Sequence, residues 1–207
     1  MEQLFDLSGG HLALDFVNTV GGMRGVSPKE HLRNYLDLVA FGQQAGVLDQ
    51  ALAGELASAA QRRPEETAAV LAAAIALRES LYRLFSDHIH DQSPRSADLS
   101  VLNAALARFL PHRRLGDRGG AFAFEWDRAG ELDAMLWPVV EAAASLFASD
   151  DLARVRICGL HESHECSWLF IDHTKGGTRR WCSMVSCGNR AKARRHHAKA
   201  MGRGGAG

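Results

Sequence analysis

All four cysteines of this 207-residue chain lie near its C-terminus, in two pairs. Cys158 and Cys166 form a C-x7-C pair, Cys182 and Cys187 form a C-x4-C pair, and 15 residues separate the pairs. Thiolate sulfur is a preferred ligand of zinc, and a short local pair brings two sulfurs to one ion at little cost in loop-closure entropy. Four cysteine ligands leave no coordination position open, so the pattern predicts one structural Zn2+ and not a catalytic one.

Buried free thiols and a pair of disulfides are the alternative roles of these cysteines. The chain begins MEQLFDLSGG, without the basic and apolar regions of a secretory signal. We therefore expect a cytoplasmic location, where clustered cysteines are more often metal ligands than disulfides. His161 and His164 lie between the first two cysteines, and the sequence leaves open whether one of them replaces a thiolate. We favour the four-cysteine set because it completes the site by itself.

The charge of the chain is divided between its two parts. Residues 1–172 contain 15 basic and 24 acidic residues, a formal charge of −9, whereas residues 173–207 contain nine Lys or Arg and no acid, a formal charge of +9. A zinc-stabilised basic segment beside an acidic body is typical of nucleic-acid binding. The alternatives are a solvated tail, or a tail that docks on an acidic surface of its own or another chain.

The basic segment resembles a known family. The run from Trp181 to Lys199, WCSMVSCGNRAKARRHHAK, is similar to the CGNR zinc finger, named after the residues Cys187 to Arg190. The preceding run CSWLFIDHTKGGTRRWC also fits that family in its W-L-F-x-D and Arg-Arg-Trp-Cys elements. The first cysteine pair of the family is usually closer together, so HESHE (residues 161–165) resembles a short insertion.

The N-terminal region resembles the ABATE domain, which usually precedes a CGNR finger and whose family is described as a stress-induced transcription regulator. The matching stretches are GGHLALDFVNTVGG, Gly9 to Gly22, and HLRNYLDLVAFGQQAGVLD, His31 to Asp49. The resemblance implies a bacterial-type regulator in which the finger contacts DNA. The N-terminal domain would then sense a small-molecule effector or form a homodimer.

Two sets of residues are candidates for binding. Near the N-terminal glycine turn, His11, Asp15 and Asn18 could line a small-molecule pocket, although a corner of satisfied polar groups is the more ordinary interpretation. Trp168 and Trp181 could stack on bases, although packing of the small zinc core is more usual for such aromatics. The residues that we expect to contact nucleic acid are Arg179, Arg180, Arg190, Lys192, Arg194, Arg195 and Lys199.

The predicted fold is mainly α (α+β), with a helical N-terminal body, a small antiparallel sheet and a C-terminal zinc finger made of a β-hairpin and a helix. We expect an ABATE-like domain over 1–150, the finger over 151–200 and a disordered tail over 201–207. The expected elements are a strand over 12–16, a helix from the N-cap Ser27 to Gly46, helices over 50–62, from Pro64 and over 96–110, a hairpin over 113–126 that could pair with the first strand, a helix over 131–149 kinked at Pro138, strands over 154–157 and 168–171, and a helix from about Ser186.

No catalytic motif stands out, and we do not expect an enzyme. The sequence contains no G-x-S-x-G, P-loop or H-E-x-x-H motif, and no apolar run long enough to span a membrane. The rival functions are a protein-interaction module, an RNA-binding module, and a ligand-binding or enzymatic body for which the finger is only an anchor.

Overall fold

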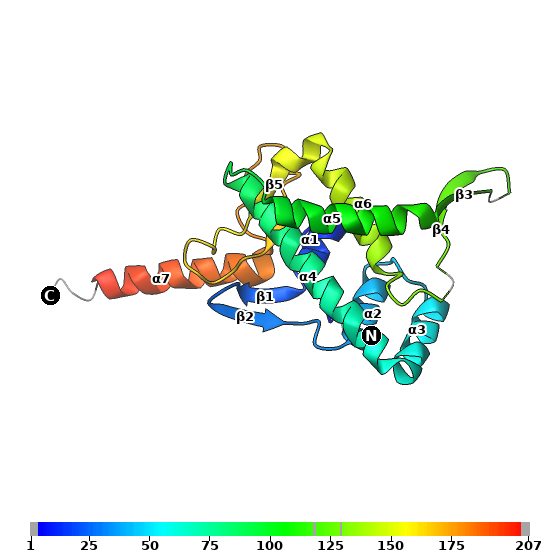
Figure 1. The fold of residues 1–207 in the computed structure, drawn as a ribbon. Coiled ribbons are helices and arrows are strands. Elements are labelled where there is room, and N and C mark those ends of the chain that lie inside the picture. The colour runs from blue at the N-terminus through cyan, green and yellow to red at the C-terminus, as the bar shows by residue number, and fades with distance from the viewer. Residues whose placement is uncertain (1–3, 118, 129, 204–207) are drawn as a thin grey trace.

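The computed structural model describes residues 4–117, 119–128 and 130–203. It consists of a helical body from which a β-hairpin and a long C-terminal helix project in opposite directions (Figure 1). The α-helices are α1 (Leu12–Val17), α2 (Tyr35–Gln44), α3 (Gln50–Arg62), α4 (Pro64–Ile89), α5 (Ser96–Phe109), α6 (Leu136–Phe147) and α7 (Asn189–Arg203). Short helical turns are η1 (Leu110–His112), η2 (Asp150–Arg154) and the π-helical η3 (Met184–Gly188). The predicted mainly α class, with small antiparallel sheets, is confirmed.

The strands form three separate two-stranded antiparallel sheets in the described part of the chain. They are β1 (Val20–Met23) with β2 (Ser27–Glu30), β3 (Arg113–Asp117) with β4 (Phe122–Trp126), and β5 (Val155–Ile157) with β6 (Leu169–Ile171). A two-stranded sheet is marginal by itself in water, so each pair needs packing from elsewhere. The β1–β2 and β5–β6 pairs are packed against the helical body.

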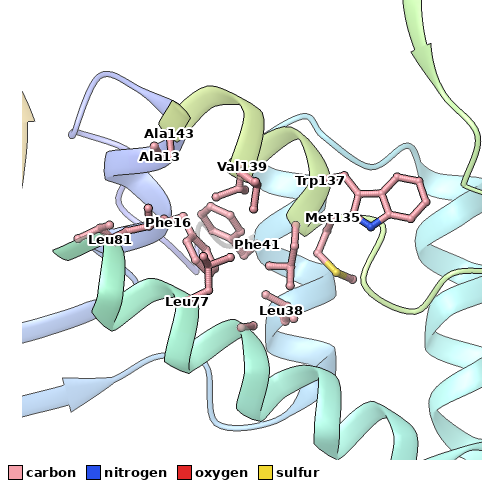
Figure 2. Close-up of a cluster of buried hydrophobic side chains, with 14 of the residues drawn as sticks. Ala13, Phe16, Leu38, Phe41, Leu77, Leu81, Met135, Trp137, Val139 and Ala143 are labelled. Carbon is pink, nitrogen blue, oxygen red and sulfur yellow. The ribbon is translucent and has the colours of Figure 1, made fainter. Parts of the chain in front are cut away.

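The body is built around a core to which α1, α2, α4 and α6 contribute (Figure 2). Phe16 of α1 and Phe41 of α2 are fully buried, with ring centroids 5.6 Å apart. Trp137 of α6 is 1 % exposed, and its Nε1 donates to Asp133 Oδ1 at 2.9 Å, so its one polar atom is satisfied inside the core. The body therefore has the large aromatic core expected of a stable domain.

The expected strand over residues 12–16 is wrong, because this segment is helix α1. The alternation of Leu12, Leu14 and Phe16 suggested a strand, but Ala13 and Val17 are buried as well. Burial at 13, 14, 16 and 17 has helical spacing. The His11 side chain also accepts a hydrogen bond from the backbone N–H of Ala13, which caps the helix start.

The expected helix start at Ser27 is also wrong. Residues Ser27–Glu30 form strand β2, and α2 starts only after Asn34, whose side chain accepts from the N–H of Asp37 at 3.0 Å. Glu30 does not cap a helix; its carboxylate accepts from Arg78, a partner 48 residues away. Glu30 lies three residues after Ser27, which is the spacing of a capping box, but its carboxylate binds a distant arginine and not the start of a helix.

Most of the other helix predictions are confirmed. Asp49 caps α3 by accepting from the N–H of Leu52, Pro64 opens α4, and α5 starts at Ser96. Helix α6 starts at Leu136, so Pro138 lies in its first turn, where a missing N–H costs nothing, and does not mark a kink. Helix α7 extends to Arg203, and the remaining residues of the expected disordered tail, 204–207, lie outside the described residues.

The β3–β4 hairpin was predicted correctly, but it does not pair with the N-terminal segment. In the described part of the chain its strands pair only with each other, with Leu115 opposite Phe124 and Asp117 opposite Phe122. Leu115, Phe122 and Phe124 share one face of the hairpin, and each is more than 60 % exposed. At its base, Trp126 contacts Trp137 of the core.

Candidate metal centre and nucleic-acid interface

The four cysteines converge on one point. Their sulfur atoms all lie within 4.8 Å of one another, and every side chain is buried. The Sγ atoms of Cys166 and Cys182 are 3.9 Å apart, and those of Cys182 and Cys187 are 3.5 Å apart. A tetrahedral zinc ion with Zn–S bonds of about 2.3 Å requires sulfur–sulfur separations of about 3.8 Å. The donor set and its spacing therefore fit one structural Zn2+.

Two local structures carry the cysteine pairs. Cys158 directly follows β5, and its N–H donates to the carbonyl of Trp168 at 2.9 Å, which extends the β5–β6 hairpin to the metal site. Cys187 lies in the η3 turn, directly before α7. The two parts are joined by a hydrogen bond of 2.7 Å from the N–H of Gly159 to the carbonyl of Arg180. A Cβ at position 159 would lie 2.8 Å from that carbonyl oxygen, so the close approach requires glycine.

The long spacing of the first pair is accommodated by a compact turn. The N–H of His161 donates to the carbonyl of Cys158 at 2.8 Å, and the N–H of Glu165 donates to that of Leu160 at 3.1 Å. Neither His161 nor His164 belongs to the sulfur cluster found among the described residues. The structure thus supports the four-cysteine set over a site with a histidine ligand.

Electrostatics favours a cation at this point. Hydrogen bonding from Cys158 and the other thiols lowers the pKa of Cys187, and Arg190 contributes by donating to its sulfur at 2.9 Å. Crowding by the neighbouring sulfurs, with burial, raises the pKa of Cys166 and of Cys182. Four buried thiolates would repel one another strongly, and a bound Zn2+ removes that repulsion.

A small apolar cluster surrounds the sulfurs. Leu160 and Phe170 are at most 2 % exposed, and the half-buried Trp168 and Trp181 pack against them. The Trp168 Nε1 donates to the carbonyl of Val20 at 2.8 Å, so this indole is fixed to the body. Packing, the interpretation favoured for both tryptophans, is confirmed.

Arg179 is half-buried, and its guanidinium is bonded within the structure. Its guanidinium donates to the carbonyl oxygens of Ser8, at 2.7 Å, Ile171 and Trp181, and lies 4.4 Å from the ring centre of Phe170. Its backbone N–H donates to Asp172 Oδ2 at 2.9 Å. Hydrogen bonds from Thr174 and from the Arg179 N–H lower the pKa of Asp172. Because Arg179 is occupied in this way, we leave it out of the nucleic-acid surface.

The zinc module is built into the body. Val155, Leu169 and Ile171 of the β5–β6 hairpin belong to the same buried cluster as the body helices. The Asn18 side chain bonds to both backbone groups of Leu169, donating to the carbonyl at 2.8 Å and accepting from the N–H at 2.9 Å. Asn18 is 2 % exposed, so these bonds are shielded from water. The finger and the first helix thus share one core and one set of hydrogen bonds.

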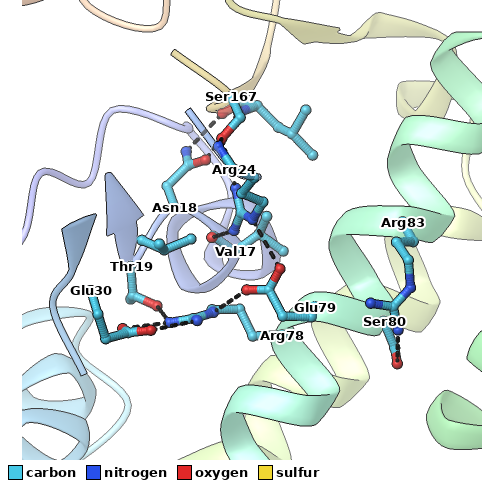
Figure 3. Close-up of polar contacts among 12 residues, drawn as sticks. Val17, Asn18, Thr19, Arg24, Glu30, Arg78, Glu79, Ser80, Arg83 and Ser167 are labelled. Atoms are coloured by element: carbon cyan, nitrogen blue, oxygen red, sulfur yellow. Dashed lines mark hydrogen bonds and ion pairs between the residues drawn. The ribbon is translucent and has the colours of Figure 1, made fainter. Parts of the chain in front are cut away.

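A second junction is a partly buried network of ion pairs around Arg78 (Figure 3). Arg78 forms two hydrogen bonds of 2.7 Å to the Glu30 carboxylate and one of 2.9 Å to Glu79, and its side chain is 3 % exposed. Arg24 bonds to Glu79 at 3.1 Å and to the Ser167 hydroxyl at 3.2 Å. Ser167 directly follows a zinc ligand, so this network connects α4 and the β1–β2 hairpin to the metal site. This network was not predicted from the sequence. Its one signal was an arginine, Arg78, between the buried Leu77 and Leu81 of α4.

The remaining basic candidates lie on the outer surface. Arg180, Arg190, Lys192, Arg194 and Arg195 are exposed. Arg190 is anchored to the metal site through Cys187, and Arg194 forms an ion pair with Glu165. The Arg180 guanidinium lies 5.2 Å from the ring centre of Trp181. Lys199 lies in α7, but its side chain is outside the described part of the structure. In Figure 1 most of α7 extends away from the body.

The expected small-molecule pocket is only partly assembled. Asp15 and Asn18 line a cavity of about 190 Å³ together with Asp6, His31 and Trp168. His11 is not among the residues that line it, because its side chain caps α1. Burial raises the pKa of Asp15 to about 6, although its carboxylate accepts from the N–H of Gly9 at 2.8 Å.

These observations define a zinc-binding protein with a helical body and a four-cysteine finger fused to it. Residues 10–150 match the ABATE family model, described as "putative stress-induced transcription regulator", and residues 154–200 match the CGNR zinc finger model. The chain belongs to the ABATE family, and both resemblances noted in the sequence are confirmed. No curated protein matches the chain. Within the described residues, no helix has the length and apolar character needed to cross a membrane.

Proposed function

We propose that this protein is a transcription regulator that binds duplex DNA through α7 and the turn that precedes it. The observation that carries the proposal is α7 itself, a projecting helix of 15 residues with six Lys or Arg and no acid. Such a helix has a diameter of about 10–12 Å and matches a major groove about 12 Å wide. Family membership supports the regulatory role.

The composition of α7 favours a polyanionic partner. Its sequence places like charges four residues apart, Arg190 with Arg194 and Arg195 with Lys199, and such pairs destabilise an isolated helix. An isolated helix of 15 residues is marginal even without repulsion. Phosphates on both sides of a groove would relieve the repulsion and stabilise the helix.

The RNA and protein-docking rivals are less well supported. Single-stranded RNA is usually held by stacking on exposed aromatic rings, whereas Trp168 and Trp181 are half-buried in the zinc core. Docking on an acidic protein surface would use the same basic residues, and the acidic body of a second copy is one such surface. Measured binding to DNA separates these functions.

The finer parts of the regulator stay predictions. An effector would occupy the cavity beside Asp15, which adjoins the finger because Trp168 lines it too. Its lining combines carboxyl, amide and imidazole groups with the apolar side chains of Leu4, Phe5 and Trp168, so it suits a small molecule with both a polar and an apolar part. A homodimer, which would enlarge the DNA contact beyond that of a single small finger, and a location in the cytoplasm stay predictions as well.

The test is a salt series of zinc-loaded protein with a fluorescent DNA duplex. We expect affinity to fall steeply with salt, and the log–log slope to flatten by roughly 0.9 for each phosphate contact that is removed. The double variant Arg194→Ala/Arg195→Ala should therefore have a slope shallower by up to about 1.8. The matched control Lys29→Ala/Arg62→Ala removes the same charge from exposed positions of the body and should keep the wild-type slope. Negligible binding at about 0.1 M salt, or equal slopes for both double variants, would reject the proposal.

A further inference from the structure

The tip of the second cysteine loop carries two exposed apolar side chains. Val185 is 83 % exposed and Met184 is 51 % exposed, in the turn between the ligands Cys182 and Cys187. Among the described side chains of residues 173–198, no other large apolar side chain is exposed. Two such side chains on an otherwise basic surface are unfavourable in water and point to a contact.

The tip is held rigidly. Two zinc ligands flank it, the N–H of Gly188 donates to the carbonyl of Ser183 at 2.9 Å, and the Asn189 amide donates to the carbonyl of Val185 at 2.9 Å. Because the backbone is already fixed, a contact made by Val185 would cost little conformational entropy.

The surroundings of the tip indicate the chemistry of its partner. The tip lies directly before α7, and the exposed guanidinium groups of Arg180 and Arg190 flank it in sequence. The partner must therefore be anionic around an apolar centre. The major groove of DNA has this combination, because phosphates line its edges and the C5-methyl of thymine is its main apolar feature.

We propose that Val185, with Met184 beside it, contacts thymine methyl groups in the major groove, so that the tip supplies sequence preference while α7 supplies phosphate contacts. This inference rests on the proposed function. It assigns base recognition to an apolar turn, whereas the charge pattern alone would assign all DNA contacts to the basic residues.

The test compares duplexes that differ only in the methyl group. Zinc-loaded full-length protein is titrated at about 0.1 M salt with an alternating dA·dT duplex and with the same duplex carrying deoxyuridine in place of thymidine. Burial of one methyl group gives a preference of about fourfold, so the wild type should bind the thymidine duplex at least that much more tightly. In a dG·dC duplex, 5-methylcytosine in place of cytosine should increase the affinity in the same direction.

The variant Val185→Ser should lose the preference and keep one zinc ion per chain. The matched control Val26→Ser changes a valine of the body that is 65 % exposed, and this variant should keep the preference for the thymidine duplex. Equal affinity of the wild type for both duplexes, or a preference that survives Val185→Ser, would overturn the inference while DNA binding stands. Absence of binding to every duplex would overturn the proposed function together with it.

Discussion

Removal of the zinc ion should unfold the body as well as the finger, in one cooperative transition. Structural zinc sites contribute apparent binding free energies of about 10–16 kcal/mol near neutral pH, and whole domains are stable by only about 5–15 kcal/mol. In this protein the β5–β6 hairpin supplies Val155, Leu169 and Ile171 to the body core. Loss of the metal would release these side chains and leave Asn18 without its partner. We expect Cys182→Ala, or treatment with a chelator, to lower the Tm by more than about 10 °C.

Circular dichroism at a helical wavelength, recorded during heating with and without a chelator, measures this effect. His161→Ala is the matched control, because His161 lies in the turn between Cys158 and Cys166 but does not belong to the sulfur cluster. This variant should keep one zinc ion and the wild-type Tm. Two separate transitions, of which the larger keeps its midpoint after zinc removal, would show that the body folds independently of the finger.

The second large effect is expected from Asn18→Ala. This substitution leaves the buried N–H and carbonyl of Leu169 without partners, and each such group costs about 1–3 kcal/mol. We therefore expect the free energy of unfolding to fall by about 2–5 kcal/mol, and the zinc affinity to fall with it, because the folding of β6 and binding of the metal are coupled. Denaturant unfolding of zinc-loaded protein measures the first quantity.

Asn18→Asp distinguishes the hydrogen bonds from the packing of the side chain. Aspartate has nearly the same shape but no N–H to donate to the Leu169 carbonyl, so it should be destabilising too. Asn103→Ala, an exposed position in α5, should change the stability by less than about 0.5 kcal/mol. A stability near that of the wild type for Asn18→Ala would show that this junction does not hold the finger.

The metal site could be predicted from the sequence because its chemistry is local. Four cysteines in two short pairs have few other roles in a reducing environment, and their arrangement in space follows from a hairpin and a turn. The long helix from Pro64 was equally accessible, since the proline at its first position, the acids of its first turn and its apolar residues at helical spacing agree with one another. In both cases the signals lie within a few turns of chain.

Several of the failures involve contacts between distant segments. Glu30 has the spacing of a helix cap but pairs with Arg78. Asn18 lines the expected cavity, but its amide group also binds the backbone of Leu169, 151 residues away, which the sequence did not predict. Arg179 belongs to the basic run, yet its guanidinium is used by carbonyl groups that only the fold brings together. A composition pattern cannot tell a buried arginine from an exposed one.

Hydrogen exchange of zinc-loaded protein tests most directly whether α7 is the element that contacts DNA. In the free protein the amides of α7 beyond its first turn should exchange rapidly, because the described helix packs mainly on the η3 turn. Addition of a duplex should slow the exchange of residues 184–198 and leave α2, α3 and α5 unchanged. Protection of the body in place of α7, or no protection at a DNA concentration that saturates binding, would contradict the claim.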